Sequence, residues 1–273
     1  MSLLWRDQLC ISLSPDQVSL VRLGKGLRRR VMEKSSHSFT VNNGATWQPA
    51  IGELEKLLKQ QGNADASVVL SNQFSRYLIV PWSDAVSGAE ELVEFTRHRC
   101  NQVYGQLAAD WDLRFSLGCF GAPLLACGVE RSLLDAIRHT CEAAGVRLIS
   151  VQPALMTVFN RKRAEMKAGG WLVFAERGRL TLALAYGNGW HAVQTRHIDG
   201  PLSDALPIML EQEQLLVDMA DVPRTAWIFA PEQTKLAVSS SGNWSVNLLS
   251  LPAMDGFSPH DNSVFGLALA GAV

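Results

Sequence analysis

The stretch CISLSPDQVSLVRL, residues 10–23, decides the fold of this chain. Apolar residues alternate with polar ones on both sides of SPDQ, which is the pattern of strands that each bury one face. SPDQ itself predicts a type I turn with Pro15 at its first central position, because proline fixes the backbone angle that this position requires. The stretch therefore predicts a β-hairpin at the start of the folded chain.

The order of elements that begins with this hairpin occurs twice. A third strand at 30–41, a helix at 47–58 and a strand at 67–71 follow the hairpin. The same order returns after the AGG break at 168–170, with strands at 171–176, 180–186 and 190–198, a helix at 203–220 and a strand at 226–230. A repeat of this length predicts two related α/β halves with mixed sheets, residues 1–168 and 169–273.

The first half also contains an additional segment at about 72–122. Strands are predicted at 76–82 and 113–117, with a helix between them. Ser87, followed three residues later by Glu90, has the pattern of a capping box at the start of that helix. The segment therefore predicts an α+β insertion in the first half.

Composition limits the kind of protein. The chain has 273 residues, of which 47% are hydrophobic and 19% charged, so it has enough apolar material for real cores. The net charge of −1 gives no general attraction to nucleic acid. No stretch approaches the roughly 20 apolar residues that span a bilayer, and the N-terminus has no apolar core of a signal peptide. We therefore expect a cytoplasmic protein that reaches a membrane only through a partner.

The five cysteines support the same compartment. Their number is odd, no C-x-x-C pair occurs, and most lie in apolar patterns. Buried free thiols in a reducing compartment are therefore expected.

The element order resembles the actin-like ATPase fold, in which two ribonuclease-H-like halves with mixed sheets flank a cleft. Within that fold the sequence is most similar to the PilM and GspL proteins of type IV pilus assembly and type II secretion. The resemblance rests on the opening hairpin and on three further stretches: VVLSNQFSRYLIVPW (68–82), AAGVRLISVQPAL (143–155) and FGLALA (265–270).

Members of the wider fold that hydrolyse ATP carry a D-x-G pattern at the first hairpin of each half. The acid holds hydrated Mg²⁺, and the glycine lets backbone N–H groups approach the phosphates. By resemblance, Ser12 takes the place of the acid and Ser14 that of the glycine in the first hairpin. In the second hairpin, FAERGRLT, the corresponding positions hold Ala175 and Arg177.

The adenosine site has also lost its pattern, because Ala230-Pro231-Glu232 stand where adjacent glycines are expected. Three altered nucleotide elements predict a protein without catalytic residues, cofactor or metal. The alternative is an active ATPase or sugar kinase of the same fold, with Asp16 and Glu176 as atypical metal ligands. His191 and His197 fall on one strand face, but two histidines without further ligands do not complete a zinc site.

The resemblance implies a non-catalytic cytoplasmic scaffold, peripheral to the inner membrane, that docks the cytoplasmic segment of a pilus or secretion assembly protein and contacts an assembly ATPase. The insertion, with its sheet edges and amphipathic helix, is the natural place for such a partner. The candidate partner-binding residues are Arg76, Tyr77, Trp82, Arg97 and Trp111. Tyr77 and Trp82 could instead pack the insertion onto the first half.

Overall fold

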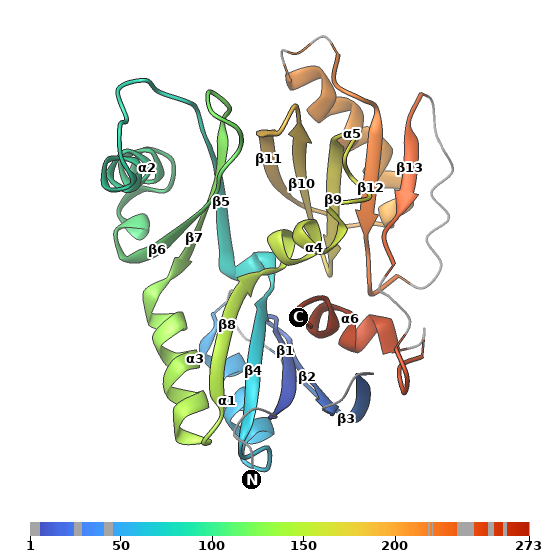
Figure 1. The fold of residues 1–273 in the computed structure, drawn as a ribbon. Helices are drawn as coiled ribbons and strands as arrows, with labels where there is room; N and C mark the ends of the chain where they lie inside the picture. The colour runs from blue at the N-terminus through green and yellow to red at the C-terminus, as the bar shows by residue number, and fades with distance from the viewer. Residues whose placement is uncertain are drawn as a thin grey trace.

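The computed structural model describes residues 6–24, 29–40, 46–217, 219, 221–233, 243–250, 254–258 and 261–272. The described residues form two five-stranded sheets and one three-stranded sheet (Figure 1). Each five-stranded sheet is the centre of one half of the molecule, and the three-stranded sheet belongs to the insertion.

The first half begins with the hairpin that the sequence predicts. β1 (Asp7–Leu13) pairs antiparallel with β2 (Gln17–Gly24), and the Ser14 N–H donates to the Gln17 carbonyl at 2.9 Å. The rest of this half comprises β3 (Arg30–Ser38), α1 (Gln48–Leu58), β4 (Ala64–Leu70) and β8 (Arg147–Pro153). The strand order is β3-β2-β1-β4-β8, with β1, β4 and β8 parallel to one another.

The second half repeats this topology strand for strand. It comprises β9 (Gly170–Glu176), β10 (Arg179–Tyr186), β11 (Gly189–His197), α5 (Leu202–Leu216), β12 (Thr225–Phe229) and β13 (Ser245–Leu248). The order is β11-β10-β9-β12-β13, so the predicted pair of related halves is confirmed. The helix predicted at 203–220 ends at Ala220, outside the described residues, and the strand that the pattern at 245–251 predicts ends at Leu251, which also lies outside them.

The sequence GNG at 187–189 contains an Asn-Gly pair, which predicts a hairpin turn with those two residues at its centre, and the turn between β10 and β11 lies one residue earlier. Gly187 and Asn188 have φ of +55° and +62°, and Gly189 already pairs with Tyr186. The two central residues of the turn are therefore Gly187 and Asn188, both in the left-handed conformation that glycine and asparagine tolerate.

The insertion is an α+β unit, as predicted. It contains η1 (Asn72–Phe74), β5 (Ser75–Val80), α2 (Ala89–Tyr104), η2 (Gly105–Asp110), β6 (Trp111–Ser116) and β7 (Leu124–Glu130). The strand order is β5-β7-β6, so β7 pairs within this sheet and the inserted segment continues to Glu130.

The predicted capping box at the start of α2 is wrong by one residue. Gly88 is the N-cap and supplies no side chain. The Ser87 backbone N–H and hydroxyl both donate to Oε2 of Glu91, at 2.8 and 2.9 Å, rather than to Glu90. The Glu91 carboxylate lies beside the positive end of the helix dipole, but no side chain of the described residues caps the first-turn N–H groups of α2.

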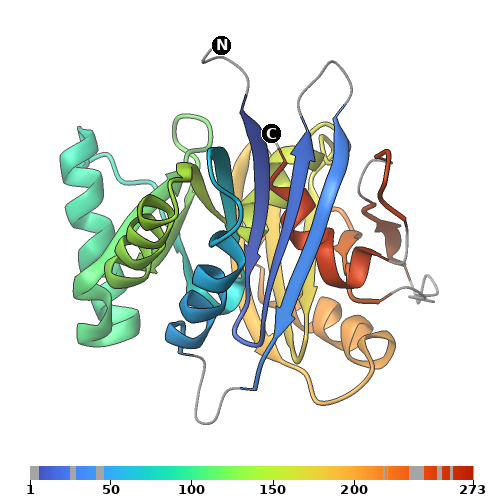
Figure 2. The ribbon, with the colours of Figure 1, turned by 90° about the horizontal axis from the view of Figure 1, so that it is seen from below.

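Helices cover both faces of the first sheet. Figure 2 shows α1 and α3 (Arg131–Ala143) on one face and α6 (Asn262–Ala270) on the other. α3 ends in a Schellman motif, with Gly145 at φ +68° and the Val146 N–H donating to the Cys141 carbonyl at 2.9 Å. Although α6 ends the chain, it packs on β1 and β2 of the first half.

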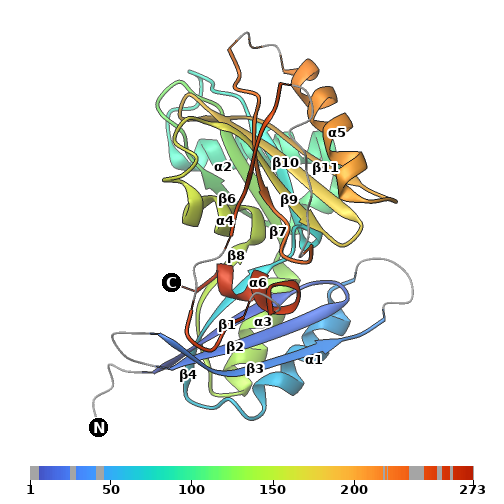
Figure 3. The same ribbon diagram turned by 90° about the vertical axis from the view of Figure 1, so that its right-hand side faces the viewer.

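One apolar core extends across both halves. Leu13 and Val68 of the first half belong to the same buried cluster as Phe174, Trp190 and Phe229 of the second. α4 (Ala154–Lys162) lies between the two sheets, where Phe159 packs against Trp190 (Figure 3). The halves are therefore joined by buried apolar surface as well as by the chain.

Four of the five cysteines are buried and Cys119 is exposed, and all five are free thiols, as the sequence predicts. In the described part of the chain, no helix combines the length and apolar character needed to cross a membrane.

Candidate functional site

The turns of the two equivalent hairpins meet at the cleft between the halves. The structure brings together the four positions that the sequence assigned to lost nucleotide contacts. These four residues, Ser12, Ser14, Ala175 and Arg177, line one small cavity. Asp16, Glu176, Glu232 and residues of α6 line the rest of it. The cavity has a volume of about 20 Å³. This is room for about one water molecule, whereas sites for small ligands measure about 300–1,000 Å³.

An ion pair crosses the cleft. Arg177 Nη1 lies 2.9 Å from Asp16 Oδ2, and Arg177 Nε lies 3.9 Å from Glu232 Oε2. Gly178, at φ +67°, makes the tight turn that points the arginine toward the first half. Arg177 stands at the glycine position of the second D-x-G pattern, and its guanidinium pairs with Asp16. Asp16 is one of the two metal ligands of the alternative ATPase hypothesis.

Glu176 is enclosed where the halves meet. Its Oε1 accepts a hydrogen bond from the Asn72 backbone N–H at 3.2 Å, and its Oε2 is buried without a partner among the described residues. Burial raises the pKa of Glu176 to about 7, although hydrogen bonds from Ser71 and Asn72 act in the opposite direction. The surroundings of Glu176 therefore favour its neutral form more than water does.

These residues do not fit a magnesium–triphosphate group. Asp16 is paired with an arginine, Glu176 is enclosed with Oε1 hydrogen-bonded to the Asn72 backbone, and the enclosed space holds about one water molecule. Within the described ranges, no three His, Cys, Asp or Glu side chains are grouped so that they could hold a metal ion. His191 instead hydrogen-bonds the Tyr186 carbonyl, and His197 pairs with Asp199.

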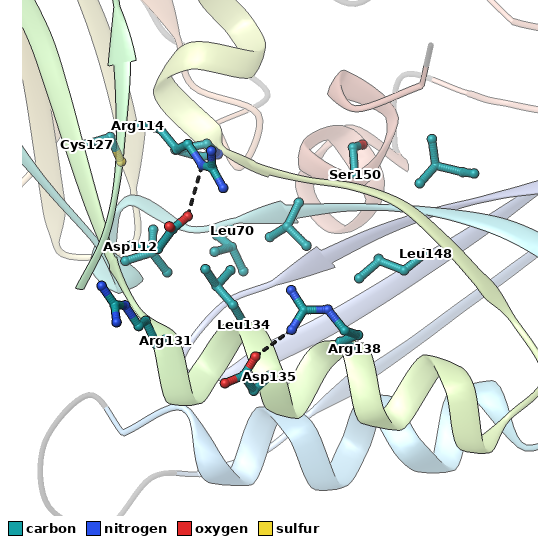
Figure 4. A pocket seen from close by; sticks show the side chains of 14 residues that line it. Leu70, Asp112, Arg114, Cys127, Arg131, Leu134, Asp135, Arg138, Leu148 and Ser150 are labelled. Carbon is teal, nitrogen blue, oxygen red and sulfur yellow. Dashed lines mark hydrogen bonds and ion pairs between the residues drawn. The ribbon is translucent and has the colours of Figure 1, made fainter. Parts of the chain in front are cut away.

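A much larger concave surface lies where the insertion meets the first half. This surface, called here the β8 groove, has a volume of about 460 Å³ and lies between α3, β6 and β8 (Figure 4). β8 is the last strand of the first sheet, and β6 is the last strand of the insertion sheet. Ile149 on β8 has 53% of its surface exposed. The groove therefore contains two strand edges that pair with no further strand in the described part of the chain.

The charges of the β8 groove come mainly from β6 and α3. Arg114 pairs with Asp112 at 2.9 Å, and Arg138 pairs with Asp135 at 2.5 Å, as Figure 4 shows. Arg131, at the first position of α3, makes no ion pair with any described residue. The groove consequently combines an apolar strand edge with an unneutralised cation.

The predicted partner-binding residues do not form one site. Arg76 and Trp111 line a second cavity of about 490 Å³, beside the start of α1. Arg76 donates to the carbonyls of Gln73 and Ser75, at 2.9 and 3.0 Å. Trp111 is 6% exposed and packs against Tyr104, so its ring supports the insertion from inside.

The other three lie apart from this cavity. Tyr77 is 6% exposed, and its hydroxyl donates to Asn72 Oδ1 at 2.6 Å, which fits the packing role that the sequence left open. Trp82 is 41% exposed and packs against Phe120 with ring centroids 4.5 Å apart. Arg97 on α2 donates to the Ala109 carbonyl at 3.2 Å.

Sequence reasoning missed Ile149, Arg138 and the edge position of β8. The stretch AAGVRLISVQPAL carries the resemblance to the PilM and GspL proteins but no sequence pattern that marks an exposed edge. The structure shows the edge position, because no residue of β8 is fully buried whereas β4 is almost entirely buried. That contrast is typical of an edge strand beside a central one.

Twin sheets of identical strand order, joined at equivalent hairpins, define this chain as a protein of the actin-like ATPase fold. No family model matches the chain, and a search of curated protein sequences found no match. Several solved structures, by contrast, have a similar fold.

A chain of the PilM–PilN type IV pilus biogenesis complex is 13% identical, with a TM-score of 0.67 over 97% of both chains. The cytoplasmic domain of EpsL, an inner membrane component of the type II secretion system of Vibrio cholerae, is 12% identical, with a TM-score of 0.60 over 97% of this chain and 94% of that one. A Bacteroides thetaiotaomicron protein with an actin-like ATPase fold and unknown function is 6% identical, with a TM-score of 0.57 over 89% and 91%. The predicted resemblance is thus confirmed in the fold.

Proposed function

We propose that this protein is a non-catalytic scaffold that docks an extended cytoplasmic segment of an inner-membrane assembly protein in the β8 groove. The unpaired edge of β8, inside a groove bounded by α3 and β6, is the observation that carries the proposal. A strand edge offers a row of backbone donors and acceptors, and an extended segment pairs with them by strand addition.

The lining of the β8 groove adds specificity to this pairing. Leu134, Leu148 and Ile149 offer apolar contacts for alternate side chains of an added strand. Arg131 is free to pair with an acidic residue of the partner. The other two arginines are already neutralised within their own ion pairs, Arg114–Asp112 and Arg138–Asp135. The proposed segment is therefore mainly apolar, with an acidic side chain near the start of α3.

The closed cleft supports the non-catalytic part of the proposal. An ATPase needs metal ligands that are free to bind Mg²⁺ and space for a triphosphate, whereas Asp16 is paired with Arg177 and the cavity holds about one water molecule. The two hairpins instead contact each other across the cleft through the Arg177–Asp16 pair. What the cleft residues retain is a structural role.

The solved structures of similar fold suggest the class of partner. One belongs to a PilM–PilN pilus biogenesis complex, and another is the cytoplasmic domain of an inner membrane secretion component. By analogy, the protein works on the cytoplasmic side of the inner membrane, for a type IV pilus or a type II secretion machine. An assembly ATPase is a second partner under this proposal.

Site-specific cross-linking in cells that make the protein tests the docking site. A photoreactive amino acid at position 149 is expected to capture an inner-membrane assembly protein, and the substitution Ile149→Glu should abolish capture at position 134. The same photoreactive group at Leu107, which is 78% exposed but outside the groove, serves as the control. Capture from Leu107 alone, or none from the groove, would contradict the proposal.

Isothermal titration with MgATP tests the non-catalytic part separately. We expect no binding tighter than about 100 μM, which corresponds to roughly 5.5 kcal/mol. Tighter binding that disappears in Asp16→Ala and Glu176→Ala would favour the ATPase hypothesis.

A further inference from the structure

We propose that the loop between β6 and β7 is a contact site for the surface of an anionic membrane. Leu117 and Phe120 would enter the headgroup boundary, and Arg163 and Lys167 would bind the lipid phosphates. The sequence predicted membrane association only through a partner protein. This inference adds a direct interfacial contact and does not depend on the proposed function.

The loop exposes apolar side chains together rather than singly. Phe120 is 90% exposed, Leu117 is 69% exposed, and Trp82 packs against Phe120 while remaining 41% exposed. The loop lies at the upper end of the insertion, away from the first half (Figure 1). Isolated exposed apolar residues need no explanation, but an exposed cluster at a loop end marks an interaction site.

The fold holds this loop in place. The Cys119 N–H donates to the Asn188 carbonyl at 3.1 Å, and the Trp190 N–H donates to the Pro123 carbonyl at 3.2 Å. A Cβ at Gly118 would lie 2.6 Å from the Asn188 carbonyl oxygen, so the backbones touch. Backbone contacts therefore hold both ends of the loop against the turn between β10 and β11, while Leu117 and Phe120 remain exposed.

A small basic cavity adjoins the loop. Its volume is about 170 Å³, and Leu117 and Gly118 line it together with the segment after α4 and the turn between β10 and β11. Arg163 and Lys167 are the only charged residues that line it, and both are exposed without an ion pair to any described residue. The neighbouring Glu165 is paired with Lys162, and Asp84 accepts a hydrogen bond from the Trp82 indole.

This combination favours a lipid surface over a protein partner. Aromatic and aliphatic groups beside unpaired cations are the features of proteins that lie at the interface of anionic bilayers. A protein partner would need a concave surface for the projecting Phe120 ring, whereas a bilayer accepts it without one. The cavity holds a phosphate-sized group, which is the part of a lipid that the two cations would bind.

Co-sedimentation of the full chain with vesicles tests the proposal. We expect binding to vesicles of phosphatidylcholine with added phosphatidylglycerol, weak binding to phosphatidylcholine alone, and weakening with salt. Neutralising one cation should lower affinity about fivefold, since each is worth about 1 kcal/mol near an anionic surface. Arg163→Gln/Lys167→Gln and Leu117→Ser/Phe120→Ser should each reduce binding at least tenfold, by about 1.4 kcal/mol or more.

Matched variants keep the test specific. Leu107→Ser, at a residue 78% exposed elsewhere on the insertion, controls for loss of apolar surface, and Lys56→Gln/Lys59→Gln on α1 controls for charge. Both should bind like the unchanged protein. Quenching of Trp82 fluorescence by brominated lipid, absent in Trp82→Phe, would support the orientation.

Three outcomes would overturn the proposal. The first is equal binding by the loop variants and their controls. The second is binding of inorganic phosphate without binding of vesicles, which would indicate a site for small anions. The third is capture of a protein through Phe120 when no vesicle binds.

Discussion

Arg177, in the turn between β9 and β10, places its Nη1 2.9 Å from Oδ2 of Asp16, in the turn between β1 and β2. The two residues are 161 positions apart and belong to equivalent hairpins of the two halves. In a nucleotide-binding member of this fold these hairpins would flank a triphosphate. Here a side chain of one hairpin satisfies the acid of the other, so the halves bind each other at this point.

The Arg177–Asp16 pair should contribute little to stability. Arg177 is 77% exposed, and exposed pairs are worth about 0.2–1 kcal/mol because water and salt screen them. A double-mutant cycle of Asp16→Asn and Arg177→Gln, followed by urea unfolding, is expected to give a coupling energy in that range that falls with salt. The Arg138–Asp135 pair of α3 is a control of similar exposure. A coupling energy above about 2 kcal/mol would show that the cleft excludes water from the pair.

Glu176 should make stability depend on pH. Its pKa is about 7 in the folded chain, compared with 4.5 ordinarily. Below about pH 4.5 the carboxyl holds its proton in both states. Between about 4.5 and 7 only the unfolded chain releases it, so stability falls as pH rises, and above about 7 the loss is complete at about 3 kcal/mol.

Urea unfolding from about pH 5 to pH 8 measures this effect. Glu176→Gln should flatten the decline, because the amide stays neutral throughout. Glu142→Gln, at an exposed position on α3, should leave the decline unchanged. An equal decline in both variants would assign the pH dependence to other groups.

Asn72 should be more important for stability than the aromatic residue it contacts. Its Oδ1 accepts from the Tyr77 hydroxyl at 2.6 Å and from the Leu155 N–H at 3.0 Å, all in buried surroundings. Asn72→Ala leaves both donors without a partner and should cost about 3 kcal/mol, whereas Tyr77→Phe removes one donor and should cost about 1 kcal/mol. Equal free energies of unfolding for the two variants would indicate that water replaces the amide.

The contact between α6 and the first sheet should be sensitive to a single methyl group. A Cβ at Gly271 would lie 2.4 Å from Cγ2 of Val69 on β4. Gly271→Ala should therefore cost about 1–3 kcal/mol by overpacking, and Val69→Ala should recover part of this loss. Gly200→Ala, where no atom lies within 4 Å of the added methyl, should change stability by less than about 0.5 kcal/mol. An equal cost at both glycines would contradict the packing argument.

Sequence alone determined the elements and their repetition. The alternation around SPDQ and the pattern of the segment at 47–58 are local signals, and each produced the element it predicted. Local signals specify the ends of elements less well. The cap of α2 and the turn between β10 and β11 each differ by one residue, because neighbouring residues offer nearly equivalent hydrogen bonds.

Tertiary structure decided which surfaces are available. It joined β7 to the insertion sheet, left β8 at an edge, and brought Arg177 to Asp16. Strand alternation and helix periodicity depend on residues a few positions apart, so they can be read directly from a sequence. The packing of complete elements decides which strand edge stays unpaired and which charges meet across 161 residues. A local sequence pattern cannot show either, because both depend on residues far apart in the chain.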